Sequence, residues 1–448
     1  MRKPLRAGLA SALLVTVSVL LTYAIAEVVF FRVALPYLSL GTLPHIPDRA
    51  AFFLQGSKSE YVPHDYIALV GDSNAQGMGD WLIDNGLDRS KPYHSADILH
   101  QLLHTDVVSL GRAASGSAEA LVLRVTEVFG ESYCYLFPPI EEPKQILIYF
   151  SESNDIDDNN ILLDNHHIRP DDADLRGQID KFLASHYGAV SGWQCHGHFG
   201  DTIFRMARYL IKYRNYAGKI LDQPAVQNIL VNGGRLGAWM LSVPSVALSK
   251  DRIDAGVLVF ERSLIWLRQR FPHVVMTLVY IPSPAAIYRH AGEEVISHDI
   301  YVPSANVSQN GEETLIDGTV FPVTAVYANS QKICEKIREV AIAQGIGFID
   351  TRPTLRAAAS ATPLHGPRDW NHLNESGYRA LGTYLARRIA GPAFDNCDDR
   401  WDVPKGLAVL PEKLYSRAGE SKHGFTRDQK NRSRATTAIA RSSPSRPR

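Results

Sequence analysis

Three residues with the side chains that nucleophilic catalysis needs stand in two distant parts of the chain. Ser73 lies in a sharp polar turn directly after the aliphatic and aromatic residues 66–70. Asp369 and His372 stand three residues apart, much later in the sequence. An aspartate at this spacing can fold back within one turn and accept the imidazole N–H, which leaves the other ring nitrogen free to deprotonate a serine hydroxyl. These residue types predict a Ser-His-Asp triad with Ser73 as the nucleophile.

Attack of a hydroxyl on an ester carbonyl also requires hydrogen-bond donors fixed around the oxyanion that forms. Asn154 follows the predicted strand 145–150, and its side-chain amide is one candidate donor. Gly111 and Gly116 follow another predicted strand, and glycines allow a backbone N–H to approach a ligand closely. Gly116 is the first choice and Gly111 the second. With the backbone N–H of Ser73, the predicted oxyanion hole consists of Ser73, Gly116 and Asn154.

The elements that must position these residues alternate along the chain. Aliphatic-rich stretches predict five strands, and longer stretches with helical spacing lie between them. The predicted strands span residues 66–70, 106–110, 145–150, 273–280 and 346–349, and the predicted helices span 96–104, 117–129, 327–343 and 375–389. Strands separated by helices favour a parallel sheet covered by helices on both faces. The expected fold is therefore α/β, with the candidate residues at the strand ends, where open α/β sheets bind ligands.

The composition of the segments outside this sheet predicts a linker, an insertion and a tail. Residues 39–65 are rich in proline, glycine and polar side chains and are predicted to be a linker before a catalytic domain over 66–415. The long stretch 156–255 is interpreted as a mostly helical insertion, either a lid or a peripheral addition, with a loop at 233–237. Residues 416–448 carry an excess of seven positive charges and few apolar side chains. This composition predicts a disordered basic tail.

The N-terminal residues 1–38 are predicted to be a cytoplasmic stub followed by a transmembrane anchor. Residues 7–26 contain no charged side chain, and a helix of that length can cross a bilayer. The basic residues before them favour a cytoplasmic N-terminus, so the catalytic domain is expected on the periplasmic side of the cell membrane as part of a single-pass protein. Ala24-Ile-Ala26 also resembles a signal-peptidase site, so a cleaved signal peptide is the alternative. Either reading predicts an exported domain.

Charge and cysteine content argue against several other classes of function. Basic and acidic residues number 47 each, so no net charge favours nucleic acid as a partner. The four cysteines contain no C-x-x-C pair, and in an exported chain they permit two disulfides in any of three pairings; they are Cys134, Cys195, Cys334 and Cys397. The histidines at 166–167 and 196–198 have no matched second ligand pair. No metal or other cofactor is expected.

Four sequence blocks together resemble the SGNH (GDSL) hydrolase family. In the family's order they are Gly71-Asp72-Ser73, the glycine turn at 111–116, Asn154-Asp155 and Asp369-x-x-His372. The resemblance covers residues 66–155 and 273–390 and is closest to members with one N-terminal membrane span. Two blocks depart from the family pattern. Ser109 stands where the second block usually has asparagine, with a longer spacing to Gly116, and Glu152-Ser153 precedes Asn154 where the third block usually has a Gly-x pair.

The resemblance implies a flavodoxin-like three-layer sandwich and a Ser-His-Asp esterase mechanism without metal. The expected substrates are small-molecule or glycan esters, such as O-acetyl or acyl groups on envelope glycans or lipids. One alternative is an O-acyltransferase that passes the acyl group to an extracellular polysaccharide. A second is a non-catalytic envelope binding or assembly protein on the same fold. The sequence does not determine the oligomeric state.

Overall fold

The computed structural model describes much of the chain between residues 3 and 401. The described residues are 3–30, 52, 55–60, 62–80, 93–113, 115–130, 140–187, 200, 203–204, 207–208, 224–297, 318–389, 391, 393–399 and 401. The predicted basic tail at 416–448 lies outside them.

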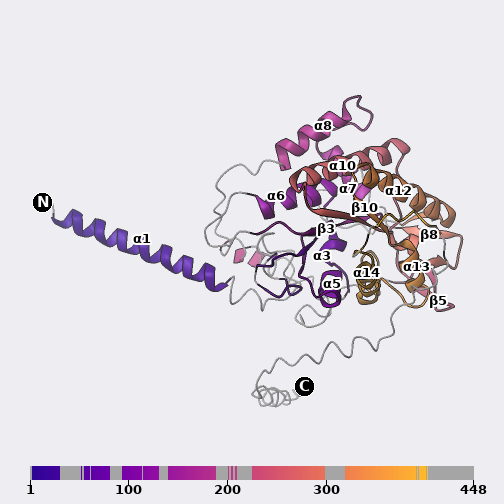
Figure 1. The fold of residues 1–448 in the computed structure, drawn as a ribbon, viewed down its shortest axis with the longest axis horizontal. Helices are drawn as coiled ribbons and strands as arrows, with labels where there is room; N and C mark the ends of the chain where they lie inside the picture. Colours follow the sequence, from indigo (N-terminus) through magenta and orange to yellow (C-terminus); the bar gives the residue numbers. More distant parts are fainter. Residues whose placement is uncertain are drawn as a thin grey trace, which may run out of the picture. The chain divides into compact units, whose positions relative to one another are not determined.

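A five-stranded parallel sheet forms the centre of the domain (Figure 1). Its strands lie in the order β10-β6-β3-β1-β2, where β1 is Ile67–Val70, β2 Val107–Ser109, β3 Gln145–Ser151, β6 Val275–Ile281 and β10 Gly347–Asp350. These are the five predicted strands, with ends that differ by at most two residues from the prediction. The direction of chain progression reverses between β1 and β3, which is where open α/β sheets bind their ligands.

Helices cover both faces of the sheet because both faces are apolar (Figure 1). On β1, Ala68 and Val70 join one core with the helices at 124–129, 250–270 and 323–343, whereas Ile67 and Leu69 join a second core with the helices at 95–103, 352–359 and 375–388. Alternate residues of a strand point to opposite faces, so a continuous apolar run indicates a sheet buried on both sides. The covering helices are α5 (Ser95–Leu103), α6 (Arg124–Phe129) after the π-helical turn η4 (Glu119–Leu123), α10 (Lys250–Arg270), α12 (Val323–Ala343), α13 (Arg352–Ala359) and α14 (Glu375–Arg388). The α/β prediction is confirmed.

The described residues of the long segment after β3 contain a β-hairpin that was not predicted. The segment begins with α7 (Asp155–Asn165), α8 (Leu175–Phe182) and the π-helical turn η5 (Leu183–Tyr187), but it then forms an antiparallel hairpin of β4 (Gln227–Val231) and β5 (Gly234–Ala238). The predicted loop at 233–237 is wrong. Asn232 and Gly233 form the hairpin turn with φ values of 50° and 73°, the left-handed pair that favours Asn-Gly in two-residue hairpins.

Shorter elements complete the domain. The strand β7 (Arg289–His290) pairs with β4, and β8 (Glu294–Ser297) forms a second antiparallel hairpin with β9 (Thr319–Pro322). The one-turn helix α11 (Pro284–Ile287) follows β6. None of these was predicted, since each is too short to show a periodic pattern.

Residues 55–59, predicted to belong to a linker, run along the outer edge of β2. The N–H of Val107 donates to the carbonyl of Ser57 at 2.9 Å, and the N–H of Ser109 donates to Oε1 of Gln55 at 2.7 Å. Phe52 is fully buried in one of the two cores. These contacts pair the backbone groups that an edge strand would otherwise expose. The folded domain therefore begins before residue 66.

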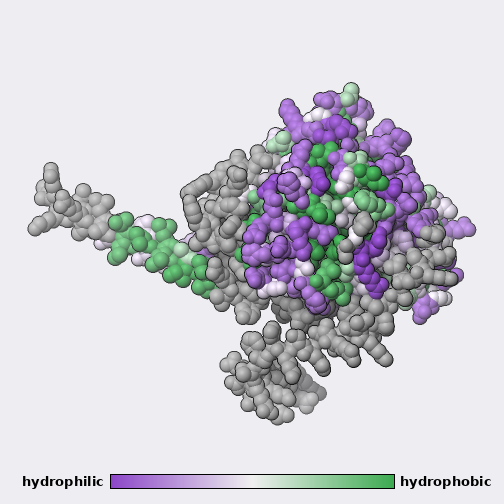
Figure 2. Space-filling model, viewed as in Figure 1, coloured by the Kyte–Doolittle hydropathy of each residue, from purple (hydrophilic) through white to green (hydrophobic). Residues whose placement is uncertain are grey.

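The N-terminal helix α1 (Lys3–Val29) contains the predicted uncharged stretch 7–26. Within it, Ser11–Val29 has a mean hydropathy of 2.2 and is long and apolar enough to span a membrane. Leu13 and Leu14 are 66 % and 69 % exposed, and Figure 2 shows apolar side chains along this helix. A signal sequence near the N-terminus would have the same length and composition.

Candidate active site

The turn after β1 places Ser73 at the start of a short helix, α3 (Ser73–Gln76). The carboxylate of Asp72 caps this helix and accepts a hydrogen bond from the N–H of Asn74 at 2.8 Å. Gly71 has a φ of 155°, and a Cβ at this position would lie 2.6 Å from the carbonyl oxygen of Tyr149 on β3. Only glycine allows so close an approach of the two strands. The N–H of Ser73 is at the first helical position, where the helix offers no acceptor.

Asp369 and His372 lie in the loop between α13 and α14. Oδ1 of Asp369 accepts hydrogen bonds from the N–H groups of Asn371 at 3.0 Å and His372 at 3.1 Å. Oδ2 of the same carboxylate lies 2.7 Å from Nδ1 of His372. Asn374 then caps α14, where its side chain accepts the N–H of Gly377 at 3.1 Å. One carboxylate thus shapes the turn and orients the imidazole ring.

The fold brings this loop against the Ser73 turn. Nε2 of His372 lies 2.9 Å from Oγ of Ser73, across a separation of 299 residues. The side chains of His372 and Asp369 are 25 % and 22 % exposed, and Ser73 is 7 % exposed. All three predicted triad residues are therefore hydrogen-bonded in series, in the order that nucleophile activation requires.

The charges around the triad favour proton uptake by His372. Burial opposes protonation of its imidazole, but the carboxylates of Asp369 and Asp72 outweigh burial and raise the pKa of His372 above 6.5. Burial also disfavours ionisation of Asp369, but His372 and the loop N–H groups lower its pKa below 3.8. Burial raises the pKa of Asp72. The base thus accepts a proton readily, while the residue that orients it stays ionised.

Asn154 lies immediately before α7, beside the Ser73 turn. Its Nδ2 donates to Oδ2 of Asp158, one turn along α7, at 3.0 Å. A hydrogen bond from the Asn154 amide also favours the ionised form of Asp72. The like charges of Asp72 and Glu119 act with burial to raise the pKa of Asp158 to about 6. The structure therefore places the predicted amide donor next to the nucleophile turn, between two carboxylates.

Serine side chains connect Asn154 to α3, the short helix that begins with Ser73. Oγ of Ser153 donates to Oδ1 of Asn154 at 3.2 Å and lies 2.8 Å from Oγ of Ser151. Ser151 in turn accepts a hydrogen bond from Nδ2 of Asn74 at 3.2 Å. The hydroxyl of Ser153, one of the departures from the family pattern, thus orients the Asn154 amide so that its nitrogen faces the carboxylates.

The N–H groups of the two candidate glycines donate to side chains of the elements on either side of their loop, η4 and β2. The N–H of Gly116 donates to Oε2 of Glu119 at 3.1 Å, and the N–H of Gly111 donates to Oγ of Ser109 at 3.2 Å. A Cβ on Gly111 would lie 2.1 Å from the backbone nitrogen of Gln76, so this glycine lets the loop pack on α3. Either N–H would serve an oxyanion only after exchanging its present acceptor.

A buried polar cluster lies at the carboxyl ends of β3, β6 and β10. The carboxylate of Glu152 accepts hydrogen bonds from the hydroxyls of Tyr280 at 2.5 Å, Ser283 at 3.0 Å and Ser330 at 2.7 Å. Arg352 pairs with Asp350 at 2.8 Å, and both side chains are at most 1 % exposed. We refer to this set as the Glu152 cluster; its members are Glu152, Tyr280, Ser283, Ser330, Asp350 and Arg352.

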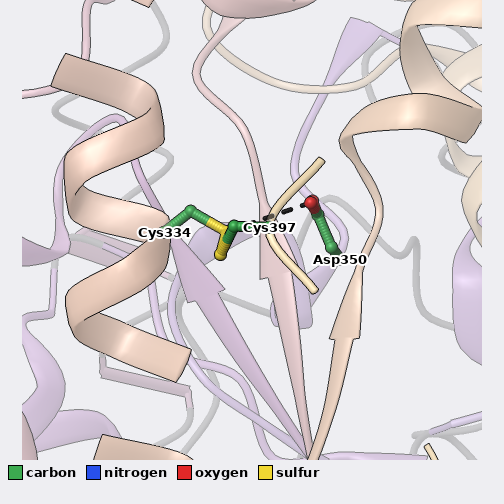
Figure 3. A group of neighbouring side chains, drawn as sticks. All are labelled: Cys334, Asp350 and Cys397. Carbon is green, nitrogen blue, oxygen red and sulfur yellow. Dashed lines mark hydrogen bonds between the residues drawn. A yellow bond between two sulfur atoms is a disulfide. The ribbon is translucent and has the colours of Figure 1, made fainter. Parts of the chain in front are cut away.

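One group of side chains has the composition of a metal site, but its sulfur atoms are bonded to each other (Figure 3). Cys334 and Cys397 form a disulfide with an S–S distance of 2.09 Å, so neither offers a thiolate to a metal beside Asp350. This bond is one of the pairings that the sequence left open. Cys134 and the 195–198 segment lie outside the described residues.

Two acidic residues beside the triad were not predicted from the sequence. Asp158 stands four residues after Asn154 on a helix, and this spacing brings side chains together, so the sequence held a usable signal. Asp80 contacts the His372 loop through the N–H of Arg368, 288 residues away. No local pattern identifies such a contact.

The chain matches no protein-family model, and searches of curated proteins and of solved structures find no match. Its own residues and their geometry are therefore the basis for a functional proposal.

Proposed function

We propose that the chain is an exported serine esterase of the SGNH type. The observation that carries the proposal is the hydrogen-bonded series Asp369–His372–Ser73, with distances of 2.7 Å and 2.9 Å. The strand order, 2-1-3-4-5 when the sheet strands are numbered along the chain, is that of flavodoxin-like sheets and supports the proposed fold type.

The proposed reaction proceeds in two halves. Nε2 of His372 takes the proton of Ser73 as Oγ attacks the ester carbonyl carbon, and the imidazolium then returns this proton to the leaving alcohol. Water hydrolyses the resulting acyl-Ser73 with the same base. Asp369 stabilises the imidazolium and holds the ring. The N–H of Ser73 is assigned to the oxyanion. The amide of Asn154 and the N–H of Gly116 are the further donors, once they exchange their present carboxylate acceptors for the oxyanion.

The proposed location follows from α1 and the basic residues before its apolar segment, which favour a catalytic domain on the periplasmic side. In that compartment the ester substrates would be O-acetyl or acyl groups on envelope glycans or lipids. An acyltransferase would share the first half-reaction and differ in the acceptor, since a sugar hydroxyl would replace water in the second.

Hydrolysis of p-nitrophenyl esters of increasing chain length by the full-length protein in detergent tests this function. We expect Ser73→Ala to lower kcat/KM by about 10⁴-fold or more, because the nucleophile is lost. Ser263→Ala is the matched control, since Ser263 is another buried serine, and its hydroxyl donates to the carbonyl of Val259 on α10. Equal activity of the wild type and Ser73→Ala would refute the proposal. Added acceptor polysaccharide that becomes acylated would identify a transferase.

A further inference from the structure

The segment that leaves the nucleophile helix contains a buried aspartate that the triad does not include. Asp80 is 4 % exposed and lies shortly after α3. Its Oδ2 accepts a hydrogen bond from the backbone N–H of Arg368 at 2.9 Å. Arg368 directly precedes the triad residue Asp369 in the sequence. This bond therefore joins the nucleophile side of the site to the loop that carries the other two triad residues.

Three further N–H groups of residues 366–372 bind within the loop itself. The N–H of Gly366 donates to the carbonyl of Asp369 at 2.7 Å, and those of Asn371 and His372 donate to the Asp369 carboxylate. Arg368, by contrast, has its acceptor outside the loop, on Asp80, whose carboxylate also receives the N–H of Asp369. Its bond to Asp80 therefore constrains the position of the whole turn relative to Ser73.

The surroundings of Asp80 are unfavourable for a carboxylate that serves packing alone. Burial and the nearby Asp369 carboxylate both disfavour its ionisation and raise its pKa, whereas the backbone N–H groups of Arg368 and Asp369 and the positive charge of Arg368 oppose that effect. Oδ1 of Asp80 is buried and has no hydrogen-bond partner among the described residues. Burying a polar atom without a partner costs free energy, so the contact with the loop is obtained at the expense of stability.

We propose that Asp80 is a positioning residue for the triad. By holding the N–H of Arg368, it keeps residues 366–372 in the place where Nε2 of His372 reaches Oγ of Ser73. The inference rests on the proposed function, but the alignment that it describes is a property of the unreacted protein. A displacement of about 1 Å in a catalytic group can lower a rate about 100-fold, so loss of this bond has a measurable consequence.

Three variants separate positioning from general stability. Asp80→Ala removes the acceptor for the Arg368 N–H. Asp80→Asn keeps an oxygen for that N–H and can place its NH₂ where Oδ1 now has no partner. Tyr378→Phe is the matched control: it removes a 2.7 Å hydrogen bond from the Tyr378 hydroxyl to the carbonyl of Met78, which ties the same segment to α14 but not to the 366–372 loop.

Two readouts are measured on the full-length protein in detergent, after thermal melting has shown that each variant folds. One is the rate constant for labelling by a fluorophosphonate, and the other is the far-downfield proton resonance of the His372 Nδ1–H. We expect Asp80→Ala to lower the rate about 10- to 100-fold and to weaken the resonance. Asp80→Asn and Tyr378→Phe should keep the resonance and most of the rate.

The proposal is overturned if Asp80→Ala keeps both the rate and the resonance, or if Asp80→Asn loses them as fully as Asp80→Ala. Should Asp80→Ala not fold, Asp80→Ser gives the same test, because its shorter side chain does not reach the Arg368 N–H. A wild type that shows the resonance but is never labelled would refute the esterase. The resonance in the Asp80 variants would then still decide the positioning role.

Discussion

The triad and the Glu152 cluster use similar side chains at the same edge of one sheet, with opposite arrangements. In the triad, His372 and Asp369 are about one quarter exposed, and Ser73 lies at the end of the hydrogen-bonded series. In the Glu152 cluster, three hydroxyls donate to one carboxylate, and the Arg352–Asp350 pair is at most 1 % exposed.

Solvent exposure and hydrogen bonding therefore distinguish a catalytic group from a group that supports the fold more clearly than residue type does. A group that exchanges protons with a substrate must reach solvent and must gain or lose a hydrogen bond without disrupting the fold. A buried ionic network has neither property, and removing one partner leaves an uncompensated charge. We therefore expect substitutions in the triad to change rates at nearly constant stability, and substitutions in the Glu152 cluster to do the reverse.

The largest expected effect on the triad side, beyond loss of the nucleophile, comes from Asp369→Asn. Loss of the charge that orients the imidazole should lower kcat by about 10⁴-fold, as expected when the base is left in the wrong tautomer. His372 should then lose the main influence that raises its pKa. The wild-type rate should rise with pH through a midpoint above 6.5, because the base must be neutral, and in the variant this midpoint should move to lower pH. A pH–rate profile of the wild type and the variant measures both the loss of kcat and the shift of the midpoint. An unchanged midpoint would contradict the assignment of Asp369.

On the structural side, Arg352→Met should destabilise the fold by about 3–5 kcal/mol, because it leaves buried carboxylates without their cation. Denaturant unfolding measures this change. The matched control is Arg176→Met, which removes an exposed ion pair with Glu261 at 3.1 Å and should cost no more than about 1 kcal/mol. The labelling rate of the folded Arg352 variant should stay near that of the wild type. Equal destabilisation by the two variants would show that the cluster does not support the fold.

A smaller effect is expected from the disulfide beside the cluster (Figure 3). Cys334 and Cys397 are 63 residues apart, and replacing both by alanine should lower the free energy of unfolding by about 2–4 kcal/mol. Nη2 of Arg352 also loses its contact with Sγ of Cys334. Reduction of the wild type should reproduce the shift in melting temperature. A melting temperature that is unchanged in both experiments would mean that the segment around Cys397 is held by other contacts.

The sequence predicted the sheet well because its strands are mostly apolar, as in the runs 67–70 and 146–150, which is expected when both faces of a sheet are buried. It predicted the triad because Asp369 and His372 are local neighbours and Ser73 follows a strand. The hairpin at 227–238 was missed although Asn232-Gly233 is a strong turn signal, since the insertion was predicted to be mostly helical and residues 233–237 to be a loop. The roles of Asp80 and of the Glu152 cluster could not be predicted from the sequence, because their contacts join segments that are far apart in the chain.

Location of a covalent adduct tests the central claim, an activated Ser73, most directly. The full-length protein in detergent is treated with a fluorophosphonate at neutral pH, digested, and analysed by mass spectrometry. We predict one adduct, on the peptide that contains Ser73, and its absence in Ser73→Ala and in heat-denatured protein. An adduct on another serine that persists in Ser73→Ala, or no adduct on the folded wild type, would contradict the account.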